Sequence, residues 1–176
     1  MSQQSASSGK IADPFRFAAE ARILKGEVAV AKFSRLVDSL VSTDGAISWS
    51  VESSMFEGVV SGQSDPRLKL RLDGTLNLRC QRCLGGLDWV LAVETVLQPV
   101  RVGQPIPDEE LEDDEVDAIE IDGELDLLAL IEDEILLALP IAPRHEQCEV
   151  PRGGNGANEE SPFAALASLR GSHRAD

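Results

Sequence analysis

The most informative absences in this sequence concern catalytic side chains. The chain has no tyrosine, only two histidines and only three cysteines. It contains none of the Gly-x-Ser-x-Gly, phosphate-binding glycine-loop or His-Glu-x-x-His patterns that place a nucleophile, a nucleotide or a catalytic zinc ion. It also has no run of about 18 apolar residues, which excludes a helix that spans a membrane. The sequence therefore predicts a protein that is not an enzyme and does not cross a membrane.

Length and cysteine use set the broad class. A chain of 176 residues fits one domain with tails. Residues 1–12 are rich in Ser and Gln and lack an apolar stretch, which predicts a disordered start and no signal peptide. An odd number of cysteines, two of them close together, does not fit a disulfide framework and favours the cytoplasm.

The negative charge is concentrated in one segment. The net charge is -15, and no Lys or Arg occurs between Arg101 and Arg144, where 15 Asp and Glu residues lie. The nearly continuous acids at 107–117 predict a solvated loop. This charge opposes binding to a phosphate backbone and favours a basic partner; alternatively, the loop serves solubility alone.

The clearest structural pattern predicts a long hairpin over about 66–98. Alternating apolar residues share one parity on its first strand: Leu68, Leu70, Leu72, Leu76, Leu78 and Cys80. A period of two buries one face of a strand and leaves the other in water. The alternation resumes from Leu87 to Leu97, after Gly85-Gly86. Gly74 lies on the apolar face, where we expect a bulge or bend.

The remaining elements complete an α+β fold built on an antiparallel sheet. Further strands are predicted at 22–31, 47–51 and 118–121, and a short amphipathic helix at 32–41. An acidic amphipathic helix is predicted over about 124–138, because apolar residues recur every three or four positions until Pro140 stops it. These elements form one domain at 13–149, between flexible tails.

The cysteines have the spacing of a metal site. Cys80 and Cys83 lie at the predicted hairpin tip, and His145 and Cys148 repeat the same spacing downstream. Two such pairs provide the four ligands of a structural zinc site. Two alternatives remain: structural cysteines without a metal, and a redox pair, although redox Cys-x-x-Cys motifs usually begin a helix.

The acidic helix and the tail predict a surface for partners. Glu132, Asp133 and Glu134 have no Lys or Arg four residues away. Together with Asp126 they form either a solvated face or a docking surface for a basic protein. Residues 150–160 read as a flexible linker, followed by a short helical element at 161–170 that carries Phe163 and Leu166. That element would dock on its own domain or on a partner.

A direct contact with RNA is the alternative. Five basic residues lie along the first hairpin strand and its turn, and each could contact phosphates: Arg67, Lys69, Arg71, Arg79 and Arg82. No aromatic residue lies among them, so they do not form a stacking platform for single-stranded RNA.

Taken together, these residues resemble the YceD family of large ribosomal RNA subunit accumulation proteins. The resemblance covers roughly 24–169. It is carried by Cys80-Gln81-Arg82-Cys83-Leu84, by the Glu132-Asp133-Glu134 helix ending in Leu139-Pro140, by Pro143, His145, Cys148 and Glu149, and by Pro162-Phe163-Ala164 with Leu166. It implies a non-enzymatic cytoplasmic ribosome-biogenesis factor that supports accumulation of large-subunit (23S) ribosomal RNA. We expect its acidic surfaces to bind a basic protein of that pathway.

Overall fold

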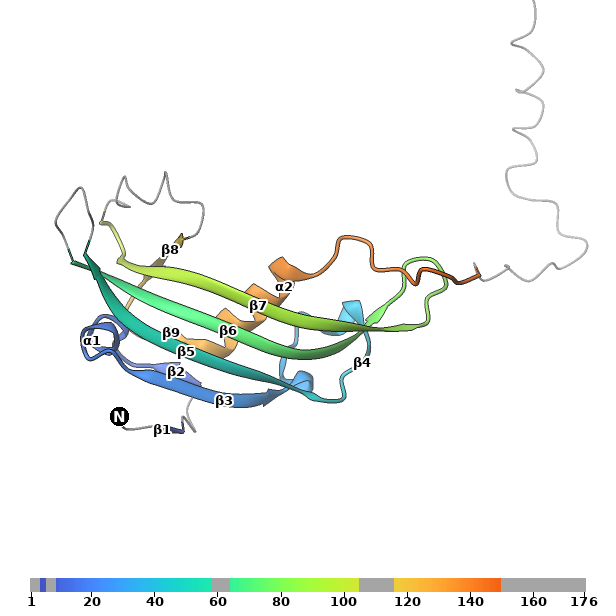
Figure 1. Cartoon of the computed structure of the whole chain (residues 1–176), viewed down its shortest axis with the longest axis horizontal. Coiled ribbons are helices and arrows are strands. Elements are labelled where there is room, and N and C mark those ends of the chain that lie inside the picture. Colours follow the sequence, from blue (N-terminus) through green and yellow to red (C-terminus); the bar gives the residue numbers. More distant parts are fainter. Residues whose placement is uncertain (1–3, 6–8, 58–63, 105–115, 150–176) are drawn as a thin grey trace, which may run out of the picture.

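The fold is built on one curved seven-stranded sheet (Figure 1). The computed structural model describes residues 4–5, 9–57, 64–104 and 116–149. The strands are ordered β1-β3-β5-β6-β7-β8, with β4 paired to β6. Among the strand pairs in these ranges, only β1–β3 and β7–β8 are parallel. The predicted α+β class with a mainly antiparallel sheet is confirmed. The strands are β1 (Gln4–Ser5), β3 (Ile23–Ala29), β4 (Leu40–Ser42), β5 (Ala46–Glu57), β6 (Ser64–Arg79), β7 (Gly86–Arg101) and β8 (Val116–Ile121).

Short elements surround this sheet. They are β2 (Lys10–Ile11), which pairs with β9 (Leu125–Asp126), the helices α1 (Pro14–Ala19) and α2 (Leu127–Ala138), and the 3-10 helices η1 (Val30–Lys32) and η2 (Val37–Ser39). Figure 1 shows α2 crossing one face of the sheet. None of the helices in the described ranges is long and apolar enough to cross a membrane.

The predicted hairpin is the centre of the sheet. Strands β6 and β7 pair without interruption from Leu68↔Leu97 to Arg79↔Gly86. The alternating leucines of β6 are all buried, as the period of two requires. Gly74 does not form the expected bulge. A Cβ on Gly74 would lie 2.5 Å from the Ile47 Cδ1 atom, so the glycine makes room for a buried side chain of the neighbouring strand.

Helix α2 matches the predicted acidic helix, apart from its first residues. Asp126 caps it, because its carboxylate accepts hydrogen bonds from the backbone N–H groups of Leu128 and Ala129. Leu127, Ile131 and Ile135 are buried. Residues Leu125–Asp126, predicted as the first helical turn, form the short strand β9 instead.

The helix predicted at 32–41 is wrong. This segment contains the end of η1, the short η2 and the start of β4. Phe33 and Leu36 are fully buried, and Leu40 pairs with Leu78 of β6. Pairing with a sheet edge supplies backbone hydrogen bonds that the segment would otherwise find in a helix. The short N-terminal helix is α1, capped by Asp13 with Pro14 in its first turn.

The predicted disordered start also needs correction. Residues Lys10–Ile11 form β2, Ile11 is buried, and the Leu127 N–H donates a 2.8 Å hydrogen bond to the Gly9 carbonyl. One apolar side chain thus anchors this polar segment beside the start of α2. Most of the acidic loop at 107–117, the linker at 150–160 and the element at 161–170 with Phe163 and Leu166 lie outside the described residues.

Replacing Gly74 with valine should destabilise the fold by about 1–3 kcal/mol, because the new side chain must displace Ile47 from a packed core. Urea unfolding followed by circular dichroism measures the change. Thr75→Val is the matched control: Thr75 is the next residue on β6 and is exposed. A Gly74→Val protein as stable as the control would contradict this account of the glycine.

Candidate functional site

The tip of the β6–β7 hairpin presents two cysteines in a tight turn. The Cys80 N–H donates to the Gly85 carbonyl, and the Leu84 N–H donates to the Cys80 carbonyl, each at 2.9 Å. Leu84 adopts the left-handed conformation with φ 63°, which lets the chain reverse directly after Cys83. Such a turn directs both thiols to the same side, the usual geometry of a zinc knuckle.

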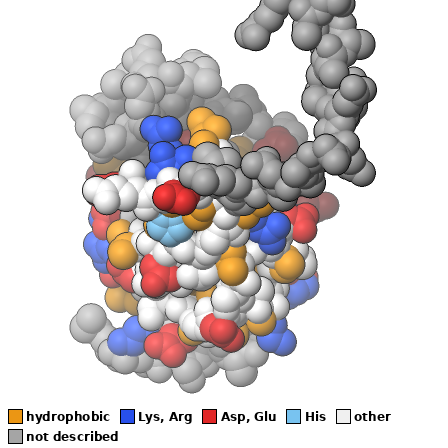
Figure 2. Space-filling model, turned by 90° about the vertical axis from the view of Figure 1, so that its right-hand side faces the viewer, with side chains coloured by type: hydrophobic (Ala, Val, Ile, Leu, Met, Phe, Trp, Pro, Cys, Tyr) orange, Lys and Arg blue, Asp and Glu red, His pale blue; other side chains and the backbone are white. Residues whose placement is uncertain are grey.

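The chain after α2 brings the second pair of ligands to this tip. The Gln81 N–H donates a 2.8 Å hydrogen bond to the Pro143 carbonyl, which fixes the returning segment beside the turn. His145 and Cys148 follow, and the ligand atoms of all four predicted metal ligands lie within 4.8 Å of one another. Figure 2 views this end of the molecule and shows a histidine side chain at its surface. The Cys₃His group could hold a metal ion.

The interatomic distances fit a tetrahedral ion. The Sγ atoms of Cys80 and Cys148 are 3.8 Å apart, and the Cys83 Sγ lies 3.4 Å from Nδ1 of His145. Zinc–sulfur bonds of about 2.3 Å and zinc–nitrogen bonds of about 2.0 Å, at tetrahedral angles, give about 3.8 Å and about 3.5 Å for these two separations. A disulfide would need about 2.05 Å, and all three cysteines are free.

A backbone hydrogen bond selects the nitrogen that His145 turns toward the thiols. Its Nε2 atom lies 2.9 Å from the Gly86 carbonyl oxygen. A carbonyl only accepts hydrogen bonds, so the neutral ring carries its proton on Nε2 and keeps a lone pair on Nδ1. Nδ1 is the atom that faces Cys83. Metal-binding histidines typically donate a hydrogen bond to a carbonyl from the ring nitrogen that does not face the metal.

The thiols differ in their acidity. The backbone N–H of Cys83 lowers the pKa of Cys80 to about 5, and the backbone groups of Arg82 and His145 add to this against the effect of burial. The Gly85 backbone lowers the pKa of Cys83, but burial and the sulfurs of Cys80 and Cys148 outweigh it and raise that pKa. The Cys80 thiol is therefore deprotonated at neutral pH, and a thiolate is the form that binds metals.

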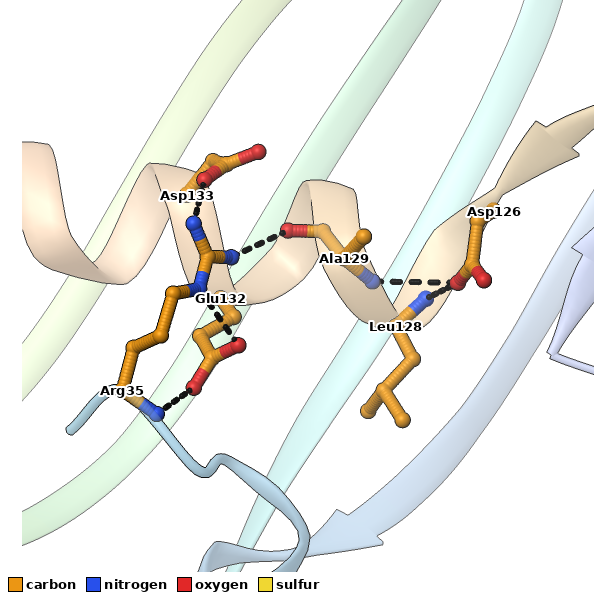
Figure 3. A network of polar contacts seen from close by, with 6 residues as sticks. All are labelled: Arg35, Asp126, Leu128, Ala129, Glu132 and Asp133. Carbon is orange, nitrogen blue, oxygen red and sulfur yellow. Dashed lines mark hydrogen bonds and ion pairs between the residues drawn. The ribbon is translucent and has the colours of Figure 1, made fainter. Parts of the chain in front are cut away.

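The acidic triad of α2 does not form one surface. Glu132 is only 7% exposed and accepts hydrogen bonds from the Arg35 backbone N–H at 2.6 Å and from its Nε at 2.9 Å (Figure 3). The same guanidinium donates to Asp133 at 2.5 Å and to the Ala129 carbonyl at 3.3 Å. The predicted partner-binding residues Glu132 and Asp133 thus have an internal partner, and Asp126 is the helix cap.

Glu134 differs from its two neighbours. Burial, together with the carboxylates of Asp117 and Asp133, raises the pKa of Glu134. The sequence placed Asp117 at the end of the acidic loop, but only the packing of α2 over the sheet brings it near Glu134. Within the described residues, Asp117 of β8 and Asp133 of α2 thus bring like charges close to Glu134.

The predicted RNA-contacting residues are also engaged within the protein. Lys69 and Arg71 pair with Glu94 at 2.5 and 2.7 Å, and Arg71 also pairs with Glu52 at 2.8 Å. Among the others, Arg67 lies over the Phe56 ring, Arg79 donates to the Leu40 carbonyl, and Arg82 donates to the Cys148 sulfur. An RNA phosphate would have to compete with these contacts.

Comparisons with known proteins agree on one family. A family model described as "Large ribosomal RNA subunit accumulation protein YceD" matches residues 68–170. A Haemophilus influenzae protein with the same name is 29% identical over an alignment of 175 positions. The alignment covers 90% of this chain and 93% of that protein. No solved structure matches.

Removing the Glu132 carboxylate should destabilise the fold. Glu132→Ala leaves the Arg35 N–H without its acceptor, and we expect the free energy of unfolding to fall by about 2 kcal/mol. Chemical unfolding of the purified protein measures it. Asp133→Ala is the control, because that carboxylate is 53% exposed and its ion pair should contribute less than about 1 kcal/mol. Equal losses in the two variants would contradict the internal role of Glu132.

Proposed function

Because the chain belongs to the YceD family of large ribosomal RNA subunit accumulation proteins, we propose that it acts in ribosome biogenesis and supports accumulation or processing of large-subunit (23S) ribosomal RNA. The family match over residues 68–170 is the observation that carries this proposal. The protein acts in the cytoplasm, by binding and not by catalysis. In support of a binding role, the polar clusters of the described residues stabilise the fold or offer metal ligands.

The protein acts through a basic protein partner. In support, the segment between Arg101 and Arg144 has 15 acidic residues and no Lys or Arg. Within it, burial raises the pKa of Glu134, and the nearby Asp117 carboxylate raises it further. A Lys or Arg of a partner would relieve that repulsion and gain charge-assisted hydrogen bonds. Direct RNA binding through β6 is less favourable, because Lys69 and Arg71 already pair with carboxylates.

Deleting the gene should lower the ratio of large- to small-subunit ribosomal RNA, and the wild-type gene should restore it. Complementation with Asp117→Asn/Glu134→Gln should restore the ratio only in part, because the surface that would bind the partner loses both charges. Arg35 keeps its contacts with Glu132 in this variant. Electrophoresis of total RNA measures the ratio. Co-purification with a tagged copy measures whether basic ribosomal or RNA-processing proteins are lost.

The control for this experiment removes two charges elsewhere. Glu27→Gln/Glu57→Gln lies on β3 and β5, where both carboxylates are exposed. An unchanged RNA ratio after deletion would end the ribosomal proposal. Restoration by both double variants would end the acidic-surface proposal only. A gel shift with large-subunit RNA that weakens steeply with salt would favour the direct RNA contact.

We also propose that Cys80, Cys83, His145 and Cys148 hold a structural zinc ion. The supporting observation is the pair of separations, 3.8 and 3.4 Å, which match two edges of a tetrahedral Cys₃His site. A bound zinc ion would join the hairpin tip to the segment after α2. The redox alternative is weaker, because Cys80 and Cys83 lie in a hairpin turn and not at the start of a helix.

Protein purified under reducing conditions should contain about one zinc ion per chain by elemental analysis. Cys83→Ser and Cys148→Ser should each lose most of it and lower the melting temperature, because the ion joins two distant segments. The redox alternative would be supported if the wild-type protein contained no metal and formed a disulfide on mild oxidation, and if the cysteine variants had the same melting temperature as the wild type.

A further inference from the structure

Arg82 lies between the two hairpin cysteines in the sequence and reaches across to the other half of the site. Its Nε atom lies 3.0 Å from the Cys148 Sγ. Its Nη2 atom donates to the carbonyl oxygens of His145 and Glu146 at 3.3 and 3.4 Å. One half-buried guanidinium therefore binds three acceptors within the four residues that carry the downstream ligands.

This geometry depends on the shape of the side chain. A guanidinium presents its N–H groups in a fixed planar fork, so it can satisfy a sulfur and two carbonyls at the same time. A lysine would bring the same charge without that fixed arrangement. The Gln81 backbone fixes the same segment at Pro143, but its contact does not reach the Cys148 sulfur. Arg82 donates directly to this sulfur at 3.0 Å, on the side where the sulfur also lies 3.8 Å from Cys80.

The charge of Arg82 also fits the centre. Three thiolates and a neutral imidazole around a divalent ion leave one negative charge. The guanidinium of Arg82 would neutralise it.

We propose that Arg82 is a positioning residue of the zinc site: it holds Cys148 in place as the fourth ligand and neutralises the thiolate-rich centre. The proposal rests on the zinc site proposed above. Arg82 would not touch the ion itself. It acts on the ion through the Cys148 sulfur and through the backbone of residues 145 and 146.

The test is a zinc competition titration of the full-length protein against a chromophoric chelator, under reducing conditions at fixed pH. Arg82→Gln should weaken zinc binding about 10–100-fold, the usual effect of losing a group that supports a ligand. The zinc affinity of Arg82→Lys should lie between those of the wild type and Arg82→Gln, because lysine keeps the charge and loses the planar arrangement of N–H groups. Arg144→Gln is the matched control, since it removes the same charge from an exposed residue next to His145 and should bind within about twofold of wild type.

A double-mutant cycle separates positioning from a general effect on folding. Cys148→Ala leaves a three-ligand site. Adding Arg82→Gln to it should weaken binding by less than about threefold, because the sulfur that Arg82 orients is gone and only its contacts with the His145 and Glu146 carbonyls remain. If the wild type binds zinc and Arg82→Gln binds it equally tightly, the role of Arg82 is overturned and the zinc site is not. A full Arg82 effect in the Cys148→Ala background would overturn that role too. Wild-type protein that binds no zinc would overturn the site itself.

Discussion

The pairing of β6 with β7 is the constraint on which the rest of the structure depends. Its unbroken register, from Leu68↔Leu97 to Arg79↔Gly86, buries one face of β6 and gives β5 and β4 a strand to pair with. It also fixes where the chain reverses. A shift of one residue would turn every leucine of β6 to solvent, and it would carry Cys80 away from the turn that holds the thiols together.

Three adjacent acids on α2 show how packing divides one sequence pattern into separate roles. Glu132 is buried and bonded to Arg35, Asp133 contacts the same guanidinium from the surface, and Glu134 lies near Asp117. Side chains at successive helical positions point about 100° apart, so they cannot share one environment. A buried carboxylate needs a partner to offset its desolvation. The segment around Arg35 supplies that partner and is thereby held against α2.

The Cys₃His group joins parts of the chain that are more than 60 residues apart. Its two halves are each local: a hairpin turn presents Cys80 and Cys83, and a short segment after Pro140 presents His145 and Cys148. The contacts from Gln81 and Arg82 cross between them. These contacts fix the end of α2 relative to the hairpin tip. The acidic helix and the candidate metal site are therefore held next to one another.

The sequence by itself determined the local elements. Alternation of period two defined the hairpin, and helical spacing and Pro140 defined α2. The repeated spacing of Cys80-Cys83 and His145-Cys148 singled out four residues whose ligand atoms the fold brings within 4.8 Å of one another. Its errors fall where side chains far apart in the chain decide the outcome. Residues 32–41 have helical spacing, but the core takes Phe33 and Leu36 while β6 pairs with Leu40. Likewise, Arg35 and Glu132 are 97 residues apart. No local pattern carries that information, because ion pairs and burial depend on distance in space and not on separation along the chain.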